Sequence, residues 1–79
     1  MKVGDKLLCE NGHIYTLADG DGFYTFTIID EFGEEINKIH DYYLEDCLIQ
    51  DEDEITSLCV GIDNNNYLKH TRVLKLIEV

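Results

Sequence analysis

The sequence predicts a small, mostly β fold: a barrel of short strands with one short helix. Short runs rich in β-branched and aromatic residues alternate with turns built from Gly, Asn and Asp, a pattern typical of strands joined in a meander. One segment alone places its apolar residues at helical spacing. With 79 residues and no linker or low-complexity tract, the chain is expected to form a single domain over residues 1–79.

Three strands are expected in the N-terminal part of the chain, at residues 6–10, 13–19 and 23–29. The turns at residues 11–12 and 20–22 separate them, because Asn, Asp and Gly adopt a positive φ at little cost. In the third strand Tyr24, Phe26 and Ile28 alternate with threonines, the period-two signature of a strand buried on one face. The core is therefore predicted to contain Leu7, Ile14, Tyr24, Phe26, Ile28, Leu58 and Leu76.

The other expected elements, in chain order, are a turn at residues 31–34, a strand at 35–40, a short helix at 41–48, an acidic loop at 51–54, a strand at 55–62, a turn at 63–66 and a strand at 72–79. The helix is expected to begin with Asp41 as its N-cap, since a short carboxylate side chain can accept a hydrogen bond from the free backbone N–H groups of a first turn. The runs of Asp, Glu and Asn are typical of loops and turns.

Negative charge is concentrated in one region. The chain has 17 acidic and 6 basic residues, for a net charge of -11, and residues 10–54 hold 14 acids and one base, Lys38, for a net charge of -13. DNA and RNA phosphates would repel this region, so direct binding of nucleic acid is disfavoured. Two interpretations stay open: the acids keep a small protein soluble, or they form a surface that recognises a basic partner.

The cysteines and the hydropathy pattern predict a cytosolic protein. No stretch approaches the roughly 18 apolar residues of a membrane span, and no basic, apolar leader opens the chain, so no membrane association is expected. The three cysteines are an odd number, which argues against a disulfide framework and favours free thiols or a metal site.

A zinc site is the most specific chemistry that the sequence suggests. Cys9 and His13 flank an Asn-Gly turn, which can aim both side chains at one point, and Cys47 and Cys59 could complete a tetrahedron. His40 and His70 compete with His13 for the fourth position. A closed site of this kind is structural and would stabilise a small, charged fold. The alternative is that the three thiols are small apolar side chains in the core.

Catalysis is disfavoured. No sequence signature joins a cysteine to a histidine, an acidic neighbour such as Asp46 raises a thiol pKa, and Ser57, the single serine, lies outside any hydrolase motif. Tyr42 and Tyr43 suggest binding instead, as an aromatic anchor in an interface. The competing interpretation places one of these tyrosines in the core and the other on the surface.

Two short motifs carry a resemblance to a known group. Val3-Gly4-Asp5-Lys6-x-x-Cys9 is followed by Gly12-x-x-Tyr15-Thr16 and then by an acidic turn at residues 30–34. Over residues 3 to about 40 this pattern resembles small SH3-like barrel proteins encoded by phages and prophages. The resemblance implies a small SH3-like barrel without catalytic residues. Such a barrel would finish near Ile49, so the remaining residues are expected to form a C-terminal extension.

Small, acidic phage proteins of this type are similar in character to inhibitors of host defence enzymes, including anti-CRISPR proteins that act on Cas9 and, in at least one case, contain zinc. The resemblance therefore implies a phage-type inhibitor, acting in the bacterial cytoplasm, that binds a Cas9-type nuclease or another basic nucleic-acid-binding protein and blocks loading of nucleic acid. An alternative is a non-enzymatic SH3-like interaction module of a larger assembly. The acids expected to contact the partner are Asp30, Glu31, Glu34, Glu35, Asp51, Glu52, Asp53 and Glu54.

Overall fold

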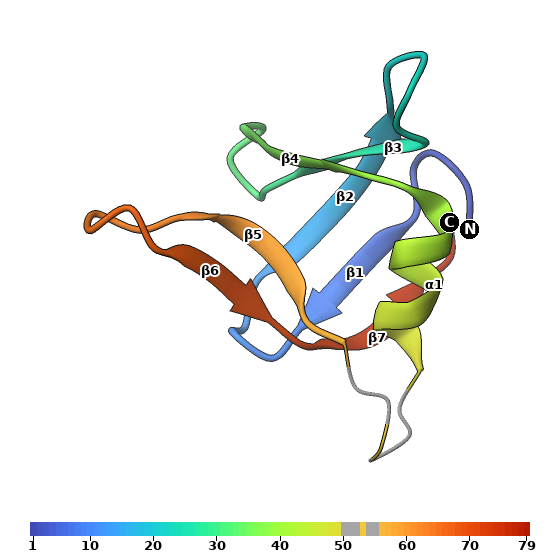
Figure 1. Cartoon of the computed structure of the whole chain (residues 1–79). Coiled ribbons are helices and arrows are strands. Elements are labelled where there is room, and N and C mark those ends of the chain that lie inside the picture. Colours follow the sequence, from blue (N-terminus) through green and yellow to red (C-terminus); the bar gives the residue numbers. More distant parts are fainter. Residues whose placement is uncertain (50–52, 54–55) are drawn as a thin grey trace.

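Residues 1–49, 53 and 56–79 are described by a computed structural model, and within them the chain forms seven strands and one short helix (Figure 1). The elements run in the order β1 (Lys6–Cys9), β2 (Ile14–Asp19), β3 (Phe26–Ile29), β4 (Glu35–Ile39), α1 (Asp41–Leu48), β5 (Leu58–Ile62), β6 (Leu68–Thr71) and β7 (Val73–Ile77). The prediction of a mostly β fold with one short helix is confirmed.

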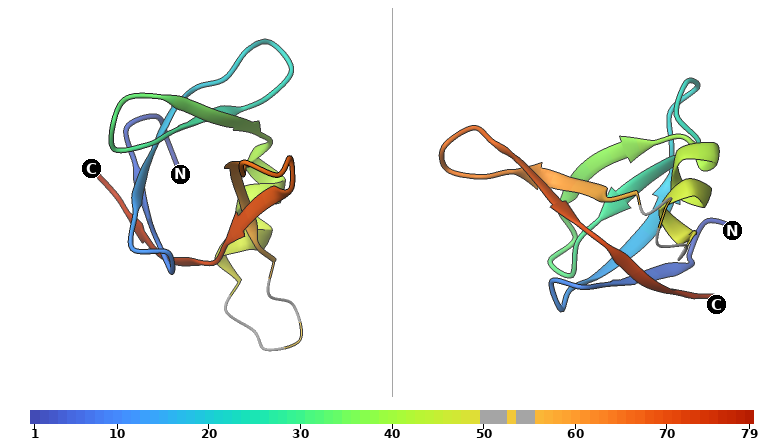
Figure 2. Two further views of the ribbon diagram at one scale, coloured as in Figure 1. Left: turned by 90° about the vertical axis from the view of Figure 1, so that its left-hand side faces the viewer. Right: turned by 60° about the horizontal axis from the view of Figure 1, so that its bottom comes forward.

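The strands form two separate sheets. Five of them make an antiparallel sheet in the order β4-β3-β2-β1-β7, and β5 pairs with β6 in a two-stranded hairpin. The larger sheet curls, and the hairpin and α1 lie across its open side (Figure 2). Asn37 of β4 donates a side-chain hydrogen bond of 3.3 Å to the carbonyl of Cys59 on β5, which ties the hairpin to the edge of the sheet. The expected barrel is therefore not closed, because no backbone ladder between described residues joins β4 to β7.

The core lies between the curled sheet, the helix and the hairpin. Leu7 of β1 lies opposite Tyr15 of β2, and Leu17 lies opposite Ile28 of β3, so alternate residues of three strands share the inner face. Of the predicted core residues, four are buried and one packs partly buried against them: Leu7, Phe26, Ile28 and Leu58, with Leu76 at the margin.

Two predicted core residues are placed differently. The prediction that Ile14 faces inward is wrong, because the inward positions of β2 are Tyr15 and Leu17, and Ile14 is half-buried on the opposite face. Tyr24 is also half-buried, since β3 begins at Phe26 and Tyr24 lies in the preceding turn. Apolar side chains occupy both faces of β2, so the local sequence does not establish which face turns inward.

Helix α1 has the bounds that the sequence predicts, but its N-cap is His40 rather than Asp41. The backbone N–H of Asp41 donates to the hydroxyl of Thr25 at 3.2 Å, which places Asp41 inside the first turn. Its carboxylate still favours the helix by lying near the positive end of the helix dipole. Leu44 and Cys47 are the buried residues of α1, and the helix packs against β7.

The C-terminal third contains a strand that the sequence analysis did not predict. The turn at residues 63–66 is confirmed: the Asp63 carboxylate accepts hydrogen bonds from the backbone N–H groups of Asn65 and Tyr67, at 2.8 and 2.9 Å. The chain then forms β6 before continuing into β7, whereas a single strand at 72–79 was expected. The resulting hairpin projects from the body of the molecule (Figure 1).

One buried carboxylate, that of Asp5, gives the opening Val3-Gly4-Asp5-Lys6 motif a structural role. Its two oxygens accept backbone hydrogen bonds from Val79, at 3.2 Å, and from Lys2, at 3.0 Å. The hydrogen bond from Val79 lowers the pKa of Asp5 against the opposing effect of burial. Asp5 thus secures the segment that follows β7 beside the start of β1.

Within the described residues, no helix is long and apolar enough to cross a membrane.

Candidate functional site

The four predicted zinc ligands occupy different surroundings. Cys9 on β1 and Cys47 on α1 are buried in the core, Cys59 on β5 is half-buried, and His13 is exposed in the turn between β1 and β2. The thiol of Cys9 points to the carbonyl of Leu7 at 4.0 Å. Among residues 1–49, 53 and 56–79, no three His, Cys, Asp or Glu side chains are grouped so that they could hold a metal ion. Zinc binding by Cys9, His13, Cys47 and Cys59 stays a prediction.

The two buried thiols are poor nucleophiles. Burial raises the pKa of Cys9 to about 11, and the neighbouring Cys47 adds to this increase. Burial, with a smaller contribution from Asp46, likewise raises the pKa of Cys47 to about 11. Both thiols are therefore protonated near neutral pH, whereas the reactive form of cysteine is the thiolate. This environment suits a core residue better than a catalytic one.

The acidic turn between β3 and β4 contains three of the predicted partner-binding residues, and a fourth, Glu35, is the first residue of β4. Asp30 accepts hydrogen bonds from the backbone N–H groups of Phe32 and Glu34, both at 2.9 Å, and Glu31 accepts one of 2.6 Å from Ile14. These two carboxylates hold the turn in place. Glu34 and Glu35 are exposed and, unlike Glu31, which is also exposed, their carboxylates accept no hydrogen bond from the described residues.

The predicted acidic loop can be placed at one position only. Asp53 is exposed, and Asp51, Glu52 and Glu54 lie outside the described residues.

A cavity of about 320 Å³ lies beside the turn between β3 and β4. Its lining includes both an acidic residue, Glu31, and a basic residue, Lys69. His13 borders the same cavity, with its Nδ1 atom 3.7 Å from a carboxylate oxygen of Glu31.

An aromatic cluster, formed by Phe23, Tyr24, His40 and Tyr42, is the feature that sequence reasoning missed. The His40 ring lies 5.0 Å from Phe23, 4.7 Å from Tyr24 and 5.0 Å from Tyr42, measured between ring centroids. The rings of His40 and Tyr42 are stacked, with an interplanar angle of 12°. Phe23 meets Tyr24 edge-on, with centroids 5.0 Å apart. Four rings from two distant segments therefore form one surface.

The pairing of β3 with β4 creates this cluster. Phe26 lies opposite Ile39 in an antiparallel pair, so the residues just before β3 and those just after β4 emerge at the same edge of the sheet. Phe23 and Tyr24 come from the first group, and His40 and Tyr42 from the second. The available sequence signal was the Tyr42-Tyr43 pair, together with aromatic residues flanking both ends of a predicted hairpin.

The turn at residues 20–25 is shaped so that it presents its two aromatic rings. One oxygen of Asp21 accepts hydrogen bonds of 2.8 Å from the backbone N–H groups of both Phe23 and Tyr24. These bonds lower the pKa of Asp21, which therefore stays ionised. The backbone of Gly20 lies so close to the Tyr24 carbonyl that a Cβ atom at position 20 would overlap it. Only glycine fits this approach.

The aromatic cluster is a surface feature rather than part of the core. Phe23 is 72% exposed, and Tyr42 is 62% exposed. A groove of about 230 Å³ is lined by three rings of the cluster, those of Tyr24, His40 and Tyr42, and also by Lys38, Tyr43 and Cys59. Tyr43 is 37% exposed and donates a hydrogen bond of 3.2 Å from its hydroxyl to the carbonyl of Ser57. Neither tyrosine of the pair is a core residue, so the interpretation that places one of them in the core is wrong, and their role as an interface anchor stays a prediction.

No known protein family, curated protein or solved structure matches this chain. The chemistry of its own surface must therefore carry any functional proposal.

Proposed function

We propose that the chain is a non-enzymatic binding protein that occupies the positively charged nucleic-acid site of another protein. In its most specific form, following the similarity in size and acidity to small phage-encoded inhibitors, the proposal is a phage-type inhibitor in the bacterial cytoplasm that binds a Cas9-type nuclease and prevents loading of nucleic acid. The observation that carries the proposal is the distribution of charge. Of the eleven described acidic residues in the segment 10–54, ten are exposed, and Lys38 is the one base of that segment.

The mechanism is electrostatic competition. Carboxylates spread over several turns present negative charge to the Lys and Arg side chains that normally meet phosphates. The long-range field steers the two proteins together, and the bound chain then excludes the phosphate backbone from the same groups. The high pKa values of the Cys9 and Cys47 thiols fit a protein that acts by binding rather than by cysteine chemistry.

Competition between the chain and nucleic acid tests the proposal. A guide-loaded Cas9-type nuclease is mixed with labelled target DNA and increasing amounts of the chain, and DNA binding and cleavage are measured together. Loss of both signals in proportion to complex formation is the expected result. A stable complex of all three components that still cuts the DNA would reject the mechanism.

A second candidate function is an interaction module of a larger assembly. The aromatic cluster favours it, because exposed aromatic rings beside a groove are typical of interfaces whose energy comes from anchors rather than from net charge. For such a module, raising the salt concentration would leave partner binding nearly unchanged, whereas the electrostatic competitor would lose affinity.

A further inference from the structure

We propose that Cys59 and His70 bind a zinc ion together with the same two residues of a second copy of the chain, so that the metal joins two hairpins. This inference goes beyond the proposed function. Cys59 on β5 and His70 on β6 lie directly opposite each other in the antiparallel register of the hairpin. Directly opposite side chains share one face of the ladder, with Cβ atoms about 4.5–5.5 Å apart. The thiol and the imidazole are therefore neighbours on one face of the hairpin.

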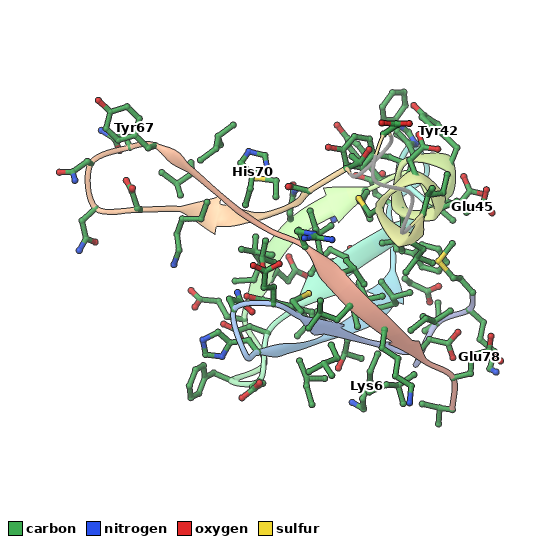
Figure 3. The ribbon with its side chains drawn as sticks, turned by 90° about the horizontal axis from the view of Figure 1, so that it is seen from below. Lys6, Tyr42, Glu45, Tyr67, His70 and Glu78 are labelled. Carbon is green, nitrogen blue, oxygen red and sulfur yellow. The ribbon has the colours of Figure 1, made fainter. Side chains whose placement is uncertain are left out.

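Both members of this pair can be reached from solvent. Cys59 is half-buried and His70 is exposed. Figure 3 shows His70 on the hairpin, between its tip at Tyr67 and the body of the molecule. A thiol must lose its proton to bind a metal, and a half-exposed thiol can release that proton to water. The buried thiols of Cys9 and Cys47 hold theirs, since burial raises the pKa of each to about 11.

A thiolate and an imidazole at this spacing form half of a zinc site. Structural zinc has four tetrahedral ligands, with sulfur at about 2.3 Å and nitrogen at about 2.0 Å. Thiolate and imidazole favour zinc over magnesium or calcium, which prefer oxygen ligands. Two copies of the pair supply two thiolates and two imidazoles. This set closes the tetrahedron and leaves no open position, as in a structural site.

The described part of the chain does not complete the site by itself. Within residues 1–49, 53 and 56–79, no three His, Cys, Asp or Glu side chains are grouped so that they could hold a metal ion. Glu10 lines the same cavity of about 290 Å³ as His70, but its Oε2 atom lies 3.7 Å from Nε of Arg72, so this carboxylate is already paired. A second copy supplies the missing ligands, because a two-fold axis brings an identical pair to face the first.

A bulge in β5 places two apolar side chains beside the pair. Between the partners Cys59 and His70 and the partners Ile62 and Leu68, β5 has two residues where β6 has one, and Gly61 in this bulge has a φ of 129°. Residues 68 and 70 share one face of β6, so all four partners lie on that face, which we call the hairpin face. Ile62 is 63% exposed and Leu68 is 62% exposed. The hairpin face thus carries exposed apolar surface next to the two ligands.

The distribution of charge favours a second copy at this end of the molecule. Residues 55–79 contain three bases and two acids, whereas residues 10–54 have a net charge of -13. Two copies therefore meet with least repulsion where their hairpins project (Figure 1). Two aliphatic side chains from each copy are a small part of the roughly 1,000 Å² that a specific interface buries. The dimer should consequently depend on the metal.

A zinc titration of the full chain tests this site. Reduced, metal-free protein is titrated with zinc chloride, while its mass is followed by analytical ultracentrifugation and its bound zinc is measured. We expect a monomer without zinc and a dimer with one zinc ion for two chains, and a chelator should reverse the change. One zinc ion on a monomer, or no change in mass at saturating zinc, would overturn the proposal.

Two pairs of variants show which side chains hold the metal. His70→Asn should abolish zinc-dependent dimerisation, whereas His13→Asn, which changes another exposed histidine, should retain it. Cys59→Ser should likewise abolish dimerisation, and Cys47→Ala should retain it. The opposite pattern, with zinc lost in His13→Asn and kept in His70→Asn, would assign the ion to the set predicted from the sequence and overturn this proposal. Melting temperatures without zinc confirm that the compared variants are folded, and the histidine pair decides alone if Cys47→Ala does not fold.

A third pair of variants locates the contact between the two copies. Leu68 and Leu74 are both exposed, at 62% and 49%, but Leu68 alone of the two lies on the hairpin face. Leu68→Ser should weaken the zinc-bound dimer about tenfold, as expected when an aliphatic side chain no longer becomes buried, and Leu74→Ser should leave its affinity unchanged. Equal affinities in both variants would show that the two copies do not meet through the hairpin face.

Discussion

His40 and Tyr42 stack ring on ring, with centroids 5.0 Å apart and planes inclined by 12°, across the start of helix α1. His40 is the N-cap and Tyr42 is the second helical residue, so the backbone at the helix start fixes the orientation of both rings. The hydrogen bond from Asp41 to Thr25 ties this start to the turn that presents Phe23 and Tyr24. Disturbing either segment should therefore disturb the whole aromatic cluster.

Gly20→Ala should disrupt the aromatic cluster, because a Cβ atom at position 20 would overlap the Tyr24 carbonyl. We expect a loss of about 1–3 kcal/mol in unfolding free energy, measured by urea titration. Gly22→Ala in the same turn is the control, since no atom lies within 4 Å of a Cβ built there. Similar behaviour of the two variants would mean that the turn is not constrained in this way.

Phe26→Ala should cost about 3–5 kcal/mol of unfolding free energy, as expected for deleting a buried aromatic ring, which is a large fraction of the stability of a small domain. Phe26 is buried on the inner face of β3, opposite Ile39. Phe32→Ala removes an exposed ring and should change stability by less than about 0.5 kcal/mol. A Phe26→Ala variant that melts at the wild-type temperature would show that the register of β3 is wrong.

The buried thiols should make stability fall at alkaline pH. Burial raises the pKa of Cys9 and Cys47 from 9.0 to about 11 in the folded chain, so the folded state holds protons that the unfolded state releases. The resulting stabilisation is complete below pH 9 and is lost as the pH rises toward 11. We expect the free energy of unfolding, obtained from urea titrations, to fall over this interval by on the order of 2 kcal/mol for each thiol.

Cysteine variants identify the source of this pH dependence. Cys47→Ala should reduce the alkaline decline in the urea midpoint, because the variant lacks one of the two buried thiols that release a proton on unfolding. Cys59→Ala leaves both buried thiols in place and should keep the slope of the unmodified chain. An unchanged slope in Cys47→Ala would contradict the assignment of the decline to the buried thiols.

The zinc prediction has its own test. If Cys9, His13, Cys47 and Cys59 bind a structural ion, untagged protein should contain about one zinc per chain, and a chelator should lower its melting temperature. His13→Ala is the decisive variant, because His13 is exposed and its replacement should be neutral unless it is a ligand. Metal analysis that finds no stoichiometric zinc would leave Cys9 and Cys47 as core thiols.

Local chemistry made most of the fold predictable. The Asn11-Gly12 and Asp63 turns are built from residues whose preferences act over a few positions; the strands on both sides of the first turn and the strand before the second were expected. β6 was missed because Leu68, Lys69 and His70 are all exposed and carry no alternating pattern. Pairing with β5 makes this segment a strand, and pairing is not a local property.

The candidate site was less predictable than the fold, for a related reason. Acidic residues such as Glu31 and Glu34 can be recognised as turn residues from their neighbours alone. The aromatic cluster instead needs Phe23 and His40, which are separated in sequence and meet only because β3 pairs with β4. Figure 3 shows how far the resulting site lies from other exposed aromatics: Tyr42 is on the helix side, and Tyr67 is at the distant end of the hairpin.

Charge reversal in the turn between β3 and β4 tests the proposed function most directly. Glu34→Lys combined with Glu35→Lys changes two exposed carboxylates that accept no hydrogen bond and form no ion pair among the described residues, unlike Asp30 and Glu31, so the variant should fold normally. Its association with a basic partner should slow, and its inhibition of DNA binding should weaken, because the steering field is reduced. Salt should act in the same direction, since the Debye length falls from about 10 Å at 0.1 M to about 3 Å at 1 M.

Glu78→Lys is the control for this reversal, because Glu78 is also exposed but lies outside the acidic segment 10–54. If acidity anywhere on the surface were sufficient, Glu78→Lys would weaken binding as much, residue for residue, as the change at Glu34 and Glu35. A regional acidic surface predicts that Glu78→Lys retains nearly full inhibition. Unchanged partner binding in the double variant, at both low and high salt, would reject electrostatic competition and favour an interaction module that binds through its aromatic cluster.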